Sequence, residues 1–368
     1  MVLDYACAFQ DAGIAGHLVH RIAQAANNPI RIMEVCGTHT MALFRHGIRS
    51  LLPRTITMLS GPGCPVCVTE QTDIDRCIAL ARQKDVVVAT FGDLMRVPGS
   101  TASLQMAKAA GADVRVVYSA MDAVNLARRQ TGRIVAFLGI GFETTAPTVG
   151  GAILAAEQLD LPNFCVLSAH KTVPPALETL MAYPGTTIDG FLLPGHVSII
   201  SGVRAYRRWF GRCQIPSVVA GFEPIDLLQG ILALVRQIQA DAPALENAYG
   251  RAVTENGNTA AQEVLARVFE PVDARWRGMG TIANSGLAIR SAYARFDAAR
   301  RFDLAVTPLP PTKGCICGDI LTGVKTPRHC PLFGSTCTPA TPVGPCMVSS
   351  EGTCAAYYSY HEQEGIRP

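Results

Sequence analysis

The chain lacks the features that mark several large classes of protein. It has no apolar stretch long enough to cross a bilayer, and its first residues lack the basic start and apolar run of a secretory signal. Lys and Arg form no clustered stripe and the net charge is only +3, so we expect neither a membrane nor a nucleic acid as partner. These absences predict a soluble cytoplasmic protein.

Two nucleotide-binding motifs are also missing. No Walker A sequence is present, and Gly139-Ile140-Gly141 lacks a third glycine at the spacing of dinucleotide-binding loops. With 49% hydrophobic and 17% charged residues, the 368-residue chain is typical of a globular protein with two or three domains. The function of the chain is therefore expected to depend on short motifs carried by its folded domains.

Four sequence blocks recur in the same order about a hundred residues further along the chain. Each block is a short apolar, β-branched run followed by a turn and then by helical periodicity. Apolar strands that alternate with helices predict parallel sheets covered by helices on both faces. The matched blocks are 30–40 with 133–145, 56–67 with 164–175, 85–99 with 189–202, and 114–123 with 216–225.

These patterns predict an α/β fold in four segments. Residues 1–29 are helical, and residues 30–130 and 131–225 form two duplicated α/β/α domains with parallel sheets. Residues 226–368 form a mostly helical region that ends in cysteine-rich chain, with amphipathic helices expected over 225–238 and 242–269. Ligands sit beyond the carboxyl ends of parallel strands, so the loops there should face a common cleft.

The motif Cys64-Pro65-Val66-Cys67 follows a predicted strand and a Gly-Pro-Gly turn. At this position a helix N-terminus lowers the thiol pKa, which is typical of dithiol exchange. Metal binding and two cysteines buried in a tight turn stay open as alternatives. The second copy has Thr172 and Pro175 in the matching block, so we expect the thiol chemistry in the first domain.

Cys36, in the sequence Cys36-Gly37-Thr38-His39-Thr40, follows another predicted strand. A single buried cysteine is usually a packing residue. Here His39 could hydrogen-bond a thiolate and Gly37 permits close approach of the backbone. Cys36 is therefore a candidate soft-metal ligand or nucleophile.

Three further polar residues are expected at loop tips of the cleft, namely Asp93, Glu143 and His196. Each could be an ordinary polar loop residue. Together they could transfer protons or support the ligands of a metal.

Six cysteines lie in Pro- and Gly-rich chain after residue 314. In a reducing compartment so many thiols indicate metal ligands or redox groups. Zinc usually takes cysteines two to four residues apart, and no gap in this tail has that length, so an iron–sulfur cluster with four ligands is favoured. Two cysteines are then left for a redox pair. The six are Cys315, Cys317, Cys330, Cys337, Cys346 and Cys354.

The chain resembles the hydrogenase maturation factor HypD family over nearly its whole length, through the motifs 36–40, 61–67, 141–145 and 330–352. The resemblance implies a scaffold on which the Fe(CN)₂CO unit of [NiFe]-hydrogenases is built. It implies iron held jointly with the small chaperone HypC, and cyanide received from HypE, which HypF supplies with carbamoyl groups. It also implies a [4Fe-4S] cluster in the C-terminal region, in surroundings like those of ferredoxin-thioredoxin reductase.

By that likeness Cys36 is the iron ligand of this chain, and Cys64 and Cys67 are a thiol pair near it. A closed cleft with polar groups would hold the cyanide and CO ligands. The expected polar residues there are Thr38, His39, Glu143, Thr144 and His196. The cluster ligands are expected to be Cys315, Cys330, Cys337 and Cys354, which leaves Cys317 and Cys346 as a redox pair that passes electrons toward Cys64 and Cys67.

Two other functions fit parts of the sequence. A stand-alone iron–sulfur thiol–disulfide oxidoreductase would use the C-x-x-C motif and the tail but leave Cys36 without a role. A structural zinc protein would use the tail alone. Whether the chain catalyses a reaction of its own stays open.

Overall fold

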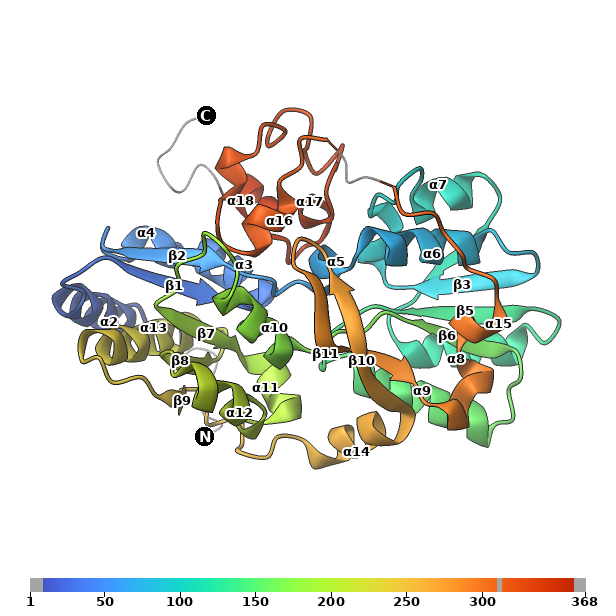
Figure 1. Ribbon diagram of the computed structural model, residues 1–368, viewed down its shortest axis with the longest axis horizontal. Coiled ribbons are helices and arrows are strands. Elements are labelled where there is room, and N and C mark those ends of the chain that lie inside the picture. Colours follow the sequence, from blue (N-terminus) through green and yellow to red (C-terminus); the bar gives the residue numbers. More distant parts are fainter. Residues whose placement is uncertain (1–8, 310–312, 361–368) are drawn as a thin grey trace.

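The computed structural model describes residues 9–309 and 313–360, and it contains two parallel sheets flanked by helices (Figure 1). The first sheet has the order β2 (Ile56–Ser60), β1 (Ile30–Glu34), β7 (Gly190–Pro194), β8 (Ser217–Ala220), β9 (Leu245–Asn247). The second sheet has the order β4 (Asp113–Val116), β3 (Val86–Thr90), β5 (Ile134–Gly139), β6 (Phe164–Ser168). Strands such as β3 and β7 are apolar and buried along their whole length, as expected for sheets covered on both faces.

Helices pack on both faces of each sheet. On the first sheet, α2 (Ala12–Ala25) and α13 (Pro224–Gln239) cover one face, and α10 (Val173–Met181) and α12 (Arg204–Cys213) the other. On the second sheet, α8 (Ala120–Arg129) and α9 (Ala146–Gln158) lie opposite α6 (Gln71–Ala81) and α7 (Leu104–Ala109). The other helices are α3 (Gly37–Arg45), α4 (Ile48–Leu51), α5 (Pro65–Val68), η1 (Gly92–Arg96), α11 (Gly195–Ser201), α14 (Thr259–Val268), η2 (Ser291–Phe296), α15 (Ala298–Arg301), α16 (Cys317–Leu321), η3 (Pro327–His329), α17 (Pro345–Val348) and α18 (Thr353–Ser359).

The strand order is consistent with the predicted duplication and reveals an exchange between the two copies. The first copy supplies β1 to β4 and the second supplies β5 to β8. The first sheet joins β1 and β2 to β7 and β8, whereas the second joins β5 and β6 to β3 and β4. When corresponding strands are matched, both sheets have the same order, apart from the additional edge strand β9 of the first sheet. Each sheet is thus completed by strands of the other copy.

The boundary predicted at residue 130 therefore does not separate the two sheets. The prediction that 30–130 and 131–225 each form a sheet of their own is wrong, because the chain changes sheet after β2 and again after β6. Apolar periodicity identifies a strand but not its neighbour. In the structure β1 pairs with β7, with Ile32 opposite Gly190.

The region after residue 225 is less helical than predicted. Helix α13 belongs to the first sheet, and the helix expected over 242–269 is interrupted, because β9 and a loop precede α14. An antiparallel hairpin of β10 (Phe269–Trp276) and β11 (Gly280–Ile289) then follows, which the periodicity did not predict. The cysteine-rich tail is mostly irregular, as expected. It lies above α3 and α5, with α18 against α3 and α17 against α5 (Figure 1).

No helix within 9–309 and 313–360 has the length and apolarity needed to cross a membrane.

Candidate functional site

Cys36 follows β1, next to the point in the first sheet where the connections between successive strands run to opposite sides. The chain leaves β1 toward β2 on one side and leaves β7 toward β8 on the other, so the carboxyl ends of β1 and β7 flank a topological switch point. Cys36 directly precedes α3, is extended (φ −146°, ψ 124°) and is 7% exposed. Its predicted position at a strand end is confirmed.

Two backbone N–H groups, those of His39 and Thr38, act on the Cys36 thiol and lower its pKa. They come from the first turn of α3, where backbone N–H groups have no partner inside the helix. Burial, followed by the charge of Glu351, raises the pKa of the Cys36 thiol to about 12, and the donors oppose that rise. The thiol is thus protonated at neutral pH, and a bound cation would favour its thiolate.

The C-x-x-C loop adjoins the Cys36 loop. The Gly37 N–H donates to the Gly63 carbonyl at 3.0 Å. Cys64 and Cys67 form a disulfide at the start of α5, with their Cα atoms 5.2 Å apart, and both are buried. The structure thus brings together the two thiol motifs that the sequence placed after neighbouring strands.

Residues 349–351 of the tail close over this pair of loops. The Thr38 hydroxyl donates to Glu351 Oε1 at 2.7 Å, and the Glu351 backbone lies against Gly37. On the other side, the Ser349 and Ser350 hydroxyls donate to Asp93 Oδ2 at 3.3 and 3.4 Å. The tail therefore connects the Cys36 loop of the first sheet to the Asp93 loop of the second.

His39 and His196 both contact the ring of Phe222. The Phe222 ring stacks on His196 with ring centroids 3.8 Å apart, and its centroid lies 4.8 Å from that of His39. His39 Nε2 lies 3.2 Å from the Ala220 carbonyl, and Nδ1 has no partner among the described residues. Burial lowers the pKa of His39 to about 4, so its imidazole is neutral. The backbone N–H of His39 thus acts on Cys36, and its ring lies against the carboxyl end of β8.

Glu143 lies at the carboxyl end of β5, the counterpart of β1 in the second copy. The Val173 N–H donates to Glu143 Oε1 at 2.9 Å, and Oε2 is buried without a partner among the described residues. Burial raises the pKa of Glu143 to about 7. The neighbouring Thr144 is half-buried. The pKa of the buried Tyr206 phenol is raised mainly by burial, and the charges of Glu143 and Cys36 raise it further.

All six tail cysteines line one pocket, together with apolar residues that include Ile320, Leu332, Phe333 and Met347. The Cys317 and Cys346 sulfur atoms are 3.0 Å apart. This contact lowers the pKa of the Cys317 thiol and raises that of Cys346. Burial, followed by the charges of other cysteines around the pocket, raises the pKa of Cys315 to about 11. The residues predicted as a redox pair are therefore in direct contact.

The thiols that line the pocket fit the donor set of an iron–sulfur cluster. Within the described part of the chain, no three His, Cys, Asp or Glu side chains form a group that could hold one metal ion. The six thiols instead surround an apolar pocket. Thiolate ligands on several turns in an apolar setting are the donor set that iron–sulfur clusters use.

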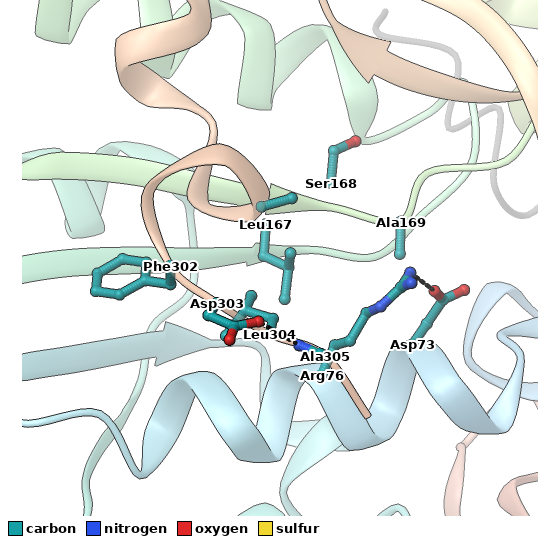
Figure 2. A pocket seen from close by; sticks show the side chains of 10 residues that line it. Asp73, Arg76, Leu167, Ser168, Ala169, Phe302, Asp303, Leu304 and Ala305 are labelled. Atoms are coloured by element: carbon teal, nitrogen blue, oxygen red, sulfur yellow. Dashed lines mark hydrogen bonds and ion pairs between the residues drawn. The ribbon is translucent and has the colours of Figure 1, made fainter. Parts of the chain in front are cut away.

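Two open cavities of about 350 and 390 Å³ adjoin each other beyond the end of β6. Asp73 lies in the wall of both and pairs with Arg76 at 3.4 Å (Figure 2). It also pairs with the buried Lys171 at 3.6 Å. The segment Phe302–Ala305 forms the opposite side of the first cavity (Figure 2). No predicted site residue lines either cavity, so they are separate from the cysteine sites.

The sequence interpretation assigned no role to three residues of the site: Glu351, Tyr206 and Arg277. Glu351 could have been found as the one acidic residue between Cys346 and Cys354. Nothing local in the sequence distinguishes Tyr206 or Arg277, which reach the site through tertiary packing.

Comparison with known proteins agrees with this geometry. The family model HypD, described as the hydrogenase formation hypA family, matches residues 13–361. The hydrogenase maturation factor HypD of Escherichia coli (strain K12) is 46% identical over 365 residues, which cover 98% of each chain. Proteins of the same name from Cupriavidus necator and Rhodobacter capsulatus are 46% and 45% identical, over 97% of this chain and 97% and 98% of theirs. The chain belongs to the HypD family of hydrogenase maturation factors.

Proposed function

We propose that the chain is a scaffold and redox protein for assembly of the Fe(CN)₂CO unit of [NiFe]-hydrogenases. The observation that carries the proposal is the setting of Cys36. Its thiol is buried at a switch point, the backbone N–H groups of His39 and Thr38 favour its thiolate, and the C-x-x-C loop and Glu351 lie beside it. A soft thiolate suits low-spin iron with cyanide and CO ligands, and nearby donors can hydrogen-bond the cyanide nitrogens.

The iron is cargo, held between Cys36 and a small chaperone. HypC is the proposed chaperone and HypE the proposed cyanide donor, itself supplied by HypF. The high pKa of free Cys36 means that iron binding releases a proton. Thr38 and His39 hold the sulfur in place through their backbone N–H groups.

The tail supplies reducing equivalents. Cys315, Cys330, Cys337 and Cys354 are the proposed ligands of a resident [4Fe-4S] cluster, and Cys317 and Cys346 form a redox pair. A bound cluster supplies electrons one at a time. The packing of α17, which carries Cys346, against α5, which carries the Cys64–Cys67 disulfide, supports transfer between the two pairs.

Infrared spectroscopy tests the proposal. The chain is purified anaerobically with and without the small chaperone, and bands of metal-bound cyanide and CO are expected in the complex. Cys36→Ala should abolish those bands and leave the absorption of the tail cluster intact. Cys213→Ala, at the end of α12, is the matched control and should retain both. Full-strength bands in the Cys36 variant would place the iron elsewhere, with Cys64 and Cys67 as the next candidates.

A second function, a stand-alone iron–sulfur thiol–disulfide oxidoreductase, is favoured by the Cys64–Cys67 disulfide beside the tail. It predicts disulfide exchange with protein substrates and no cyanide or CO bands in any complex. The same infrared experiment therefore separates the two functions.

A further inference from the structure

The tip of the β10–β11 hairpin lies between the two thiol pairs. Trp276, at the end of β10, bridges to Thr69, which directly follows α5. The next residues of the tip are Arg277 and Gly278. The Gly278 backbone lies so close to the Cα of Gly318, beside Cys317, that a Cβ at Gly278 would fall 2.3 Å away. The tip thus touches α5 on one side and α16 on the other.

Arg277 makes three directed contacts with the chain just after Cys67. Its backbone N–H donates to the Val68 carbonyl at 2.9 Å, and its Nε donates to the Thr69 carbonyl at 3.0 Å. Its Nη1 donates to Gln71 Oε1 at 3.0 Å. These donors bind the C-terminal end of α5 and the residues that follow it. They therefore attach α5, which contains Cys67 of the disulfide, to the hairpin.

The remaining nitrogen of this guanidinium, Nη2, is buried without a hydrogen-bond partner among the described residues. A buried guanidinium donor without a partner is costly unless negative charge appears near it. Thiol–disulfide exchange between the two thiol pairs creates a thiolate at each step.

We propose that Arg277 is a positioning residue that aligns the Cys64–Cys67 disulfide with the Cys317–Cys346 pair and stabilises the negative sulfur of the exchange between them. This role rests on the proposed function, because it assumes that the tail pair reduces the C-x-x-C pair.

The transfer balances as a thiol–disulfide exchange. A thiolate of the tail pair attacks a sulfur of the Cys64–Cys67 disulfide and forms a mixed disulfide between the pairs, and one sulfur leaves as a thiolate. The second tail thiol then displaces the other sulfur. The tail pair ends as a disulfide, and its electrons and protons end on Cys64 and Cys67. Two electrons, delivered one at a time by an external low-potential donor, and two protons from solvent restore the tail pair to thiols.

Thiol trapping tests the role of Arg277 in the full, cluster-loaded chain. Dithionite is added anaerobically to oxidised protein, samples are alkylated over time, and mass spectrometry counts free thiols at each pair. In the wild type, thiols should appear at Cys317 and Cys346 before Cys64 and Cys67. In Arg277→Gln the appearance of thiols at Cys64 and Cys67 should slow by about tenfold or more, as expected for loss of charge-assisted hydrogen bonds. The appearance of thiols at Cys317 and Cys346 should be unchanged.

Two variants and one reagent separate positioning from general stability. Arg277→Lys keeps the charge and should recover part of the rate, and Arg275→Gln, at an exposed position of β10, should behave as wild type. Direct reduction of Cys64–Cys67 by dithiothreitol, and the iron content, should be the same in all variants. A wild-type rate in Arg277→Gln overturns the proposal. Wild-type protein that reduces Cys64–Cys67 before the tail pair overturns the relay itself, and the role of Arg277 with it.

Discussion

Gly63 lies against the backbone of Cys36 so closely that a Cβ at Gly63 would fall 2.3 Å from the Cys36 Cα and 2.3 Å from its nitrogen. Backbone cannot move aside as a flexible side chain can. The C-x-x-C loop and the Cys36 loop therefore form one unit, whose spacing depends on the absence of a side chain at Gly63.

Gly63→Ala should separate these loops. Overpacking of this kind costs about 1–3 kcal/mol of the free energy of unfolding, and the shift of Cys36 should weaken iron binding further. Denaturant unfolding and iron content of the chaperone complex measure the two effects. Gly151→Ala is the control, because a Cβ at Gly151, inside α9, would meet nothing within 4 Å. That change should stabilise the protein by about 0.5–1 kcal/mol. Equal effects at the two glycines would contradict the argument.

The proposed division of the tail cysteines predicts two classes of variant. Cys330→Ala and Cys337→Ala should lose the cluster, whereas Cys317→Ala and Cys346→Ala should retain it and fail in cofactor assembly. Iron and sulfide analysis after anaerobic reconstitution should give about four of each per chain in the wild type and in the second class. One zinc and no sulfide would exclude a cluster.

The assignment of Cys315 as a cluster ligand and of Cys317 as a redox residue has its own test. If Cys317→Ala loses the iron while Cys315→Ala retains it, the ligand and the redox residue have been assigned the wrong way round. The contact between the Cys317 and Cys346 sulfur atoms favours the assignment made here.

The strands and their loops were predictable because their signals are local. The apolar run over Val86–Thr90 predicted a strand, and the structure has the fully buried β3 there. Cys36 was likewise predictable at a strand end. The neighbour of β1 was not predictable, because both copies contain suitable strands and only the packing of the whole chain selects β7.

The site residues that were missed depend on contacts between distant parts of the chain. Glu351 reaches Thr38 from the tail, and Arg277 reaches Thr69 from a hairpin. Neither has a pattern of neighbours in the sequence that indicates its partner. The hairpin itself was missed because residues 269–289 include Pro271 and several glycines, which weaken the alternation expected of strands.

Glu351 is expected to shield Cys36. Glu351→Ala removes the carboxylate that accepts the Thr38 hydroxyl and the side chain that covers Gly37. Cys36 should then react faster with iodoacetamide, on the order of tenfold if the lost contacts are worth about 1.4 kcal/mol. Mass spectrometry of the Cys36 peptide measures the rate. Glu263→Ala, at an exposed position of α14, should leave it unchanged. An unchanged rate in Glu351→Ala would mean that the tail does not limit access to Cys36.

Glu143 should make the stability of the fold depend on pH. Burial raises its pKa from 4.5 to about 7, so between these values the folded protein keeps a proton that the unfolded chain releases. The free energy of unfolding therefore falls as the pH rises through this interval, and the contribution of Glu143 is fully present only below it. Its size is on the order of 3 kcal/mol.

Glu143→Gln removes this titration and leaves an amide oxygen to accept the Val173 N–H. Denaturant unfolding at several pH values should show the variant gaining stability relative to wild type as the pH rises from about 4.5 to about 7, because only the wild type then exposes a carboxyl group that ionises on unfolding. Glu263→Gln should show a constant difference, since its side chain is exposed. If the difference between Glu143→Gln and wild type is also constant, Glu143 is ionised in the folded protein, and it would then act in the cleft as a hydrogen-bond acceptor rather than a proton donor.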